Sequence, residues 1–187
     1  MSHCSQDKKS AKEEIQRMPK SDHNAAHYFI ETHLEAGRGE AIAFIEAASG
    51  KRISYGTLSA NSSKVAGALT KAGIKREERA AILMLDSIDY AEVFWGCLKA
   101  GVIAVPINTL LAGAVYDTIL SDNRASCLFV SAALLQVVKP VIAKNDHIRK
   151  VIVVGDPPLE DGFESYQTFT KGAPEQAAVA VSPDETA

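Results

Sequence analysis

The chain has 187 residues, enough for one domain with its own core, or for one domain and a piece of another. Hydrophobic residues make up 47% and charged residues 23%, ordinary fractions for a globular protein. The net charge of −3 argues against nucleic acid as a partner, and no apolar run approaches the roughly 20 residues that span a bilayer.

The amino terminus and the cysteines indicate a cytoplasmic protein. The polar start lacks the apolar segment of a secretory signal. The odd, scattered thiols Cys4, Cys97 and Cys127 suit a reducing compartment, and the last two lie in apolar stretches where burial is expected.

In chain order, residues 1–22 are charged without a hydrophobic period and predict a mobile polar tail. Asn24 can cap a helix that ends near Gly37. Two β-prone runs, AIAFIE and ISY, surround a Ser-Gly turn and predict a hairpin. The apolar face of the first helix is expected to hold Tyr28, Phe29, Thr32 and His33.

A long helix is predicted from Ser54 to Gly73, because apolar residues recur at helical spacing after a capping serine. Strands and helices then alternate, with Ser87 as the cap of the next helix and Gly101 at its end. The remaining elements are expected at AAILML, VIAVPI, 114–120, 127–130, 132–142 and 151–154, with a weaker element at 163–169.

Such alternation with short connections predicts an α/β fold with a mostly parallel sheet flanked by helices, preceded by the β-hairpin. We expect residues 23–155 to form one subdomain. Residues 156–187, which contain Pro157-Pro158 and an Ala-, Pro- and Glu-rich end, are expected to form a loop-rich connection.

Several kinds of site are disfavoured by the residues. Gly37-Arg38-Gly39 follows a helix instead of a strand and lacks a third glycine, so it predicts a helix-ending turn instead of a phosphate loop. His23, His27 and His33 have no accompanying cysteine or carboxylate pattern, which favours surface histidines over a metal site. A buried Cys97 is a poor nucleophile.

Asp86 ends a predicted strand at the carboxyl edge of the sheet, where ligands of α/β proteins bind. A helix-capping role beside Ser87 explains it at least as well. No catalytic set that could act alone is found in the sequence.

The stretch LDSIDYAEVFWGCLKAGVIAVPINTLL (85–111) resembles adenylate-forming enzymes, which carry a helix ending in L-K-A-G, a short strand, proline and asparagine or aspartate. Ile53–Leu58 is similar to the earlier family signature [LI]-[ST]-Y-x-x-L. The strings LD-S-ID, NTLL and SDNRA followed by LFVSAALL are most similar to benzoate–CoA ligases.

The resemblance implies the amino-terminal portion of an aromatic-acid–CoA ligase that uses ATP, CoA and Mg²⁺ and acts on an aromatic carboxylic acid. It implies that the ATP-handling residues lie beyond this stretch, so the chain itself is expected to be inactive and to bind none of these. In some relatives the loop after the conserved strand borders the CoA nucleotide. Asn108 and Thr109 are the corresponding candidates here, with strand-end packing as the alternative.

Two other interpretations stay open. The chain could be a non-catalytic flavodoxin- or receiver-like α/β module for binding or dimerisation, although AFIEAA offers only Glu46 where a receiver has paired acids. The parent enzyme could use another acid, such as a hydroxybenzoate, a cinnamate or a medium-chain fatty acid. An isolated piece could also expose apolar surface that the rest of the enzyme covers, which makes self-association an additional expectation.

Overall fold

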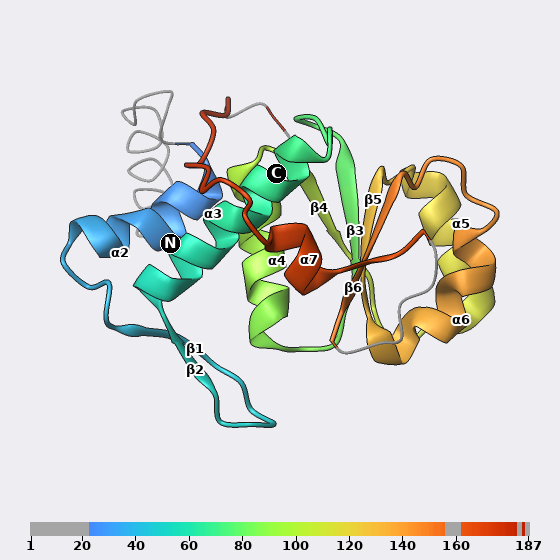
Figure 1. Ribbon diagram of the computed structural model, residues 1–187, viewed down its shortest axis with the longest axis horizontal. Coiled ribbons are helices and arrows are strands. Elements are labelled where there is room, and N and C mark those ends of the chain that lie inside the picture. The colour runs from blue at the N-terminus through green and yellow to red at the C-terminus, as the bar shows by residue number, and fades with distance from the viewer. Residues whose placement is uncertain (1–22, 156–161, 183–184, 186–187) are drawn as a thin grey trace, which may run out of the picture.

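The computed structural model describes residues 23–155, 162–182 and 185 (Figure 1). The predicted tail 1–22, Cys4 and the Pro157-Pro158 pair lie outside the described residues. The elements are η2 (His27–Glu31), α2 (Thr32–Glu35), β1 (Ile42–Ile45), β2 (Arg52–Ser54), α3 (Tyr55–Lys71), β3 (Arg79–Leu83), α4 (Ile88–Lys99), β4 (Ile103–Pro106), α5 (Gly113–Asn123), β5 (Cys127–Ser131), α6 (Ala132–Ile142), β6 (Lys150–Val154), β7 (Glu164–Ser165) and α7 (Tyr166–Thr170).

The main sheet has five strands in the order β4-β3-β5-β6-β7, and all four pairings are parallel. β1 and β2 pair antiparallel as a separate hairpin that projects from the body (Figure 1). The predicted α/β class, the parallel sheet and the early hairpin are therefore confirmed.

The sheet is covered on both faces (Figure 1). Ala80 and Ile82 of β3 pack with residues of α3, α4 and α7, whereas their neighbours Ala81 and Leu83 pack with α5 and α6. This alternation follows from the two-residue period of a strand. Because both faces are buried, the central strands are apolar throughout, as the run AAILML predicted.

α3 and α4 lie together on one face because small residues let them approach. A Cβ added at Gly96 would stand 2.5 Å from the Cβ of Val65, closer than real side chains come. Both helices begin at the predicted serine caps: Ser54 accepts a hydrogen bond from the Thr57 N–H, and Ser87 accepts one from the Tyr90 N–H.

The first helix differs from its prediction. Asn24 does cap it, since its Oδ1 accepts from the Ala26 N–H, but the chain then forms the π-helical η2. Tyr28 and Phe29 of the expected apolar face are 53% and 55% exposed, and the buried residues are Ala26 and Ile30. The wider π turn shifts which residues face the core, and hydrophobic spacing alone does not reveal such a turn.

The weaker element expected at 163–169 is present as β7 and α7. β7 adds a parallel strand beside β6, and α7 places Tyr166 and Phe169 in the core shared with α3 and α4. Residues 173–182, here named the strap, have no regular secondary structure and run across α3 (Figure 1). The division of the chain at residues 22 and 155 stays a prediction.

No helix in the described part of the chain has the length and apolar character needed to span a membrane.

Candidate functional site

The carboxyl edge of the sheet has a point where the chain connections diverge. The helix after β3 leads to β4 on one side, and the helix after β5 leads to β6 on the other. In doubly wound sheets, ligands bind in the crevice outside the strands at such a point. A ligand site is therefore expected at the segments that follow β3 and β5.

Those two segments are joined by a hydrogen bond. The Leu85 N–H donates to Ser131 Oγ over 2.9 Å. Leu85 is 46% exposed and Asp86 beside it is exposed as well, so this edge is open to solvent. Ser131 therefore holds the loop after β3 in place and leaves Asp86 at the surface.

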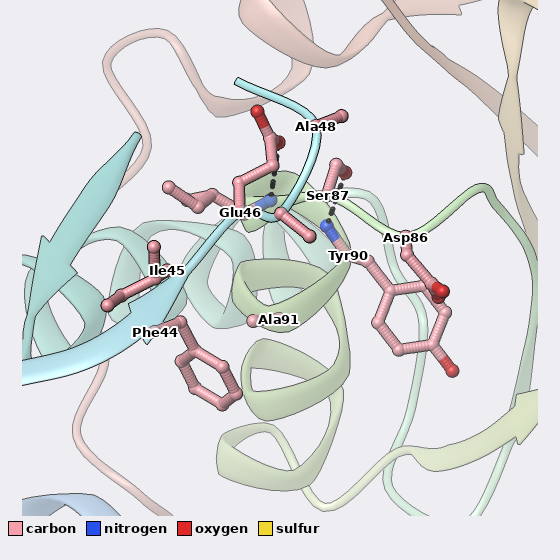
Figure 2. Close-up of a pocket in the computed structure, with 10 residues that line it drawn as sticks. Phe44, Ile45, Glu46, Ala48, Asp86, Ser87, Tyr90 and Ala91 are labelled. Carbon is pink, nitrogen blue, oxygen red and sulfur yellow. Dashed lines mark hydrogen bonds between the residues drawn. The ribbon is translucent and has the colours of Figure 1, made fainter. Parts of the chain in front are cut away.

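A pocket of about 380 Å³ adjoins this edge between the hairpin and the first turn of α4 (Figure 2). Figure 2 shows Phe44, Ile45 and Glu46 approaching from the hairpin, and the N-cap Ser87 with Tyr90 and Ala91 approaching from the start of α4. The pocket is lined by Phe44, Ile45, Glu46, Ala47, Ala48, Asp86, Ser87, Ile88, Tyr90 and Ala91.

The N–H groups at the start of α4 are already engaged within this pocket. Glu46 accepts from the Ile88 N–H at 3.2 Å, and Ser87 Oγ accepts from the Tyr90 N–H at 3.2 Å (Figure 2). Hydrogen bonds from Ser49 and Ile88 lower the pKa of Glu46. The helix terminus that could otherwise attract an anion is therefore capped by a carboxylate of the chain.

The charge of the pocket is negative. Asp86 and Glu46 line it, and Asp89 stands in the first turn of α4, where burial raises its pKa. Burial and the Asp86 charge also raise the pKa of Tyr90. An apolar pocket rimmed by acids disfavours phosphates and carboxylates and does not fit a nucleotide phosphate.

Asp86 lies where the sequence predicted, after β3 at the carboxyl edge. The helix-capping role that was the alternative for Asp86 is filled by Ser87, whose Oγ accepts the hydrogen bond from the Tyr90 N–H. The argument that Asp86 binds a ligand therefore rests on its place on the pocket wall.

Asn108 and Thr109 follow β4, the edge strand next to β3. The Leu110 N–H donates to Asn108 Oδ1 at 2.9 Å, and the Tyr116 hydroxyl donates to the Asn108 carbonyl at 3.2 Å. Leu110 is 90% exposed. The loop is thus a folded turn anchored to α5, and the two candidates lie on neither wall of the pocket in Figure 2.

Structural contacts are found for two of the described histidines, and both described cysteines are buried. His33 stacks on Tyr55 with ring centroids 3.9 Å apart, and His27 lies 4.0 Å from Glu35. Cys97 and Cys127 are free and buried, and burial raises the pKa of Cys97 to about 12. Within the described ranges, no group of three His, Cys, Asp or Glu could hold a metal ion.

Two buried polar clusters were missed by sequence reasoning. Lys99, only 1% exposed, contacts the Glu31 carboxylate at 2.5 Å and donates to Ser59 and Ser63. Burial lowers the pKa of Lys99, and the hydrogen bond and charge of Glu31 oppose that shift.

The second cluster is centred on Glu92, which accepts from the Tyr166 hydroxyl and from the Asn61 amide, each at 2.7 Å. Both clusters tie α3 and α4 to other elements, and neither opens onto the pocket of Figure 2. The only sequence signal was the lysine of the L-K-A-G string, which no local pattern marks as buried.

Comparison with known proteins adds what the geometry lacks. Residues 31–187 match the profile of the AMP-binding enzyme family. The chain is 36% identical over 141 residues to a 4-hydroxybenzoate–CoA/benzoate–CoA ligase of Rhodopseudomonas palustris. The matched stretch covers 75% of the chain and 26% of that ligase. It is 33% identical over 134 residues to the benzoate–CoA ligase of Thauera aromatica, covering 71% of the chain and 25% of that ligase.

Solved structures of CoA ligases are similar to this chain as well. The anthranilate CoA ligase AuaEII in complex with anthranoyl-AMP superposes with a TM-score of 0.80 at 28% identity, over 90% of this chain and 32% of that one. A benzoate CoA ligase from Burkholderia xenovorans LB400 gives 0.72 at 29% identity, over 84% and 30%. The chain spans about a quarter of the length of the two curated relatives above.

Proposed function

The chain belongs to the AMP-binding enzyme family, and on that premise we propose that it forms the amino-terminal scaffold of an aromatic-carboxylate–CoA ligase and is inactive alone. The observation that carries this proposal is the 36% identity over 141 residues to a ligase of benzoate and 4-hydroxybenzoate. The structural likeness to an anthranilate and a benzoate CoA ligase supports it.

The proposed reaction has two steps. A carboxylate is a poor electrophile, so one of its oxygens attacks the α-phosphorus of ATP, which gives an acyl-adenylate and releases pyrophosphate. The CoA thiol then attacks the acyl carbon, gives up its proton and displaces AMP, which leaves the aryl thioester. Charge on the phosphates is neutralised by fixed donors and Mg²⁺ in chemistry of this kind.

The described residues do not fit the phosphates of ATP or the Mg²⁺ that accompanies them. Acids rim the pocket beside α4, and the described part of the chain brings no three ligating side chains together. We therefore assign none of the adenylating steps to this chain. Its part in the proposed enzyme is to hold the sheet and its two helical layers in a fixed arrangement.

For CoA we keep Asn108 and Thr109 as proposed neighbours of its nucleotide. The loop 108–111 carries no charged side chain, so it would contribute polar and packing contacts instead of an ion pair with a phosphate. Replacing Thr109 by Ala in the complete ligase should raise the KM for CoA several-fold and leave ATP–pyrophosphate exchange unchanged. An unchanged KM for CoA would remove this assignment.

The acid specificity is proposed at the level of aromatic carboxylates. This specificity is tested on the complete ligase by measuring AMP formation with benzoate, 4-hydroxybenzoate, a cinnamate and a medium-chain fatty acid. Preference for a benzoate-type acid supports the proposal, and preference for the fatty acid would contradict it.

One observation favours a second candidate. The strand order β4-β3-β5-β6-β7 is the flavodoxin-like doubly wound order, which a free-standing binding module would share. A receiver would place paired acids at the first strand of that sheet, but Glu46 follows the separate hairpin. Sequencing the gene beyond Ala187 decides: a Ser-Gly-Thr-Gly-type loop favours the ligase, and a stop codon favours the module.

We also propose that the 187 residues self-associate when alone. Five large apolar side chains on η2 and β1 are between 42% and 57% exposed, and we name them the exposed apolar set: Tyr28, Phe29, Ile42, Phe44 and Ile45. A two-stranded hairpin is marginally stable by itself, so a covering partner is expected. The two free, buried thiols fit the proposed cytoplasmic location.

A further inference from the structure

The strap leaves α7 and crosses α3 against its backbone. A Cβ added at Gly67 would lie 1.9 Å from the carbonyl oxygen of Pro174, so only glycine allows the strap to lie this close. One helical turn earlier, the Ser63 carbonyl accepts from the Gln176 N–H at 3.1 Å. The Thr70 hydroxyl donates to the Gln176 side chain at 2.7 Å.

The strap is then fastened at the end of α4. The Val179 N–H donates to the Lys99 carbonyl at 2.9 Å, which satisfies one of the last carbonyls of that helix. The Val179 carbonyl accepts from Asn24 Nδ2 at 3.0 Å. Both backbone groups of Val179 are therefore held, one by a helix and one by a side chain.

Asn24 is the residue that joins three segments. It is 2% exposed; its Nδ2 also donates to the Leu98 carbonyl at 2.8 Å, and its Oδ1 accepts from the Ala26 N–H at 3.0 Å. Both amide hydrogens and the carbonyl oxygen are thus used. The amino-terminal helix, the end of α4 and the strap meet at this one side chain.

Two described residues beyond Val179, Ser182 and Glu185, also have hydrogen-bond partners. Glu185 accepts from the Ser182 N–H at 3.0 Å and pairs with Arg76, which precedes β3 at the amino edge of the sheet. The polypeptide therefore reaches residue 185 on the α3–α4 side, away from the carboxyl edge that holds Asp86 and Asn108.

We propose that Asn24 is a positioning residue: it clamps the strap to the end of α4 and so fixes where the ATP-handling polypeptide of the complete ligase leaves this scaffold. This step rests on the proposed function, because it assumes that such polypeptide follows. A shift of about 1 Å in reacting groups can cost a hundredfold in rate, so a loosened departure point should reach the chemistry.

The first test is hydrogen exchange over residues 174–182 in the 187-residue protein. Asn24→Asp keeps the oxygen that caps the first helix but places a second oxygen against two carbonyls, so exchange there should accelerate roughly tenfold or more. Gly67→Ala should do the same through the Pro174 contact, although alanine favours the helix itself. Ser54→Ala, which removes the cap of α3, should leave the strap unchanged.

The second test uses the complete ligase. Asn24→Asp and Gly67→Ala should each lower kcat for acid-dependent ATP–pyrophosphate exchange about tenfold or more, while Ser54→Ala stays within twofold at a temperature where all three are folded. A strap that exchanges as in the wild type in both variants would overturn the clamp. A loosened strap with unchanged kinetics would overturn the positioning role and leave the proposed ligase function standing.

A wild-type ligase that forms no adenylate with any acid tested would overturn the proposed function, and the positioning role with it. The exchange measurement would then still decide whether Asn24 holds the strap.

Discussion

At the scale of single residues, the structure is held by buried polar groups whose partners lie far away in the chain. Lys99 reaches back 40 residues to Ser59, and Glu92 reaches forward 74 residues to Tyr166. Burying such groups costs free energy unless they are paired, so each cluster is sensitive to the loss of one member.

Replacing Lys99 by Met keeps the length of the side chain but leaves Glu31 and two serines without their ammonium partner. We expect a loss of about 3 kcal/mol in the free energy of unfolding, measured by urea denaturation. Lys71→Met, on the exposed last turn of α3, is the matched control and should change it by less than about 0.5 kcal/mol. Equal stability of the two variants would contradict a structural ion pair.

Glu46 links the hairpin to α4 in a pH-dependent way. Its pKa is lowered below the ordinary 4.5 by hydrogen bonds from Ser49 and Ile88, so its contribution is present above about pH 4.5 and lost as pH falls through the lowered value. Lys51, Asp89 and the pocket-lining Asp86 are other charged groups close to this region.

Protection of the Ile88 amide against hydrogen exchange should therefore fall below about pH 4.5 in the wild type. Glu46→Gln should remove this dependence, because an amide does not titrate in this range. The idea fails if the variant and the wild type show the same pH profile at this amide.

The helix caps could be predicted from the sequence because each involves a hydrogen bond between residues close together in the chain. Ser54, Ser87 and Asn24 bond to backbone groups two or three residues away, within reach of a sequence pattern. The buried lysine and the clamp on Val179 could not, since their partners are placed by tertiary packing alone.

At the scale of elements, the contact between α3 and α4 depends on glycine. Gly96→Ala would press a methyl group into Val65 and should destabilise the fold by about 1–3 kcal/mol, despite the helix preference of alanine. Gly113→Ala in α5 meets nothing closer than 3.8 Å and should be neutral or stabilising. Thermal unfolding of both variants checks this, and a stabilised Gly96→Ala would contradict the close packing.

Most elements were predictable because strands buried on both faces and amphipathic helices differ in pattern and length. An element was expected at 163–169, but the strand character of β7 was not, because two residues acquire strand structure only by pairing with β6. The order of the strands could not be predicted from the sequence either, because the alternation of elements fits several arrangements.

At the scale of the whole molecule, the exposed apolar set on η2 and β1 is where we expect a partner to bind. We expect the 187 residues to associate as concentration rises, and Ile45→Lys to shift the mass measured by light scattering toward the monomer. Val137→Lys, an exposed position on α6 with 47% exposure, is the control and should leave the mass unchanged. A wild type that stays monomeric at every concentration would refute this expectation.

The candidate site was only partly predictable at this scale. The sequence placed Asp86 at the carboxyl edge, but the pocket beside it also needs Phe44, Ile45 and Glu46 from the hairpin. How that hairpin sits against α4 depends on the hydrogen bond from the Ile88 N–H to Glu46, across 42 residues.

We propose that this chain is the scaffold of the ligase and that the groups that activate ATP lie elsewhere in the complete enzyme. Benzoate-dependent ATP–pyrophosphate exchange, measured on the 187 residues and on the uninterrupted ligase side by side, tests it most directly. We predict no exchange with the 187 residues and clear exchange with the uninterrupted protein. Exchange by the 187 residues alone would show that groups that activate ATP are present in this chain.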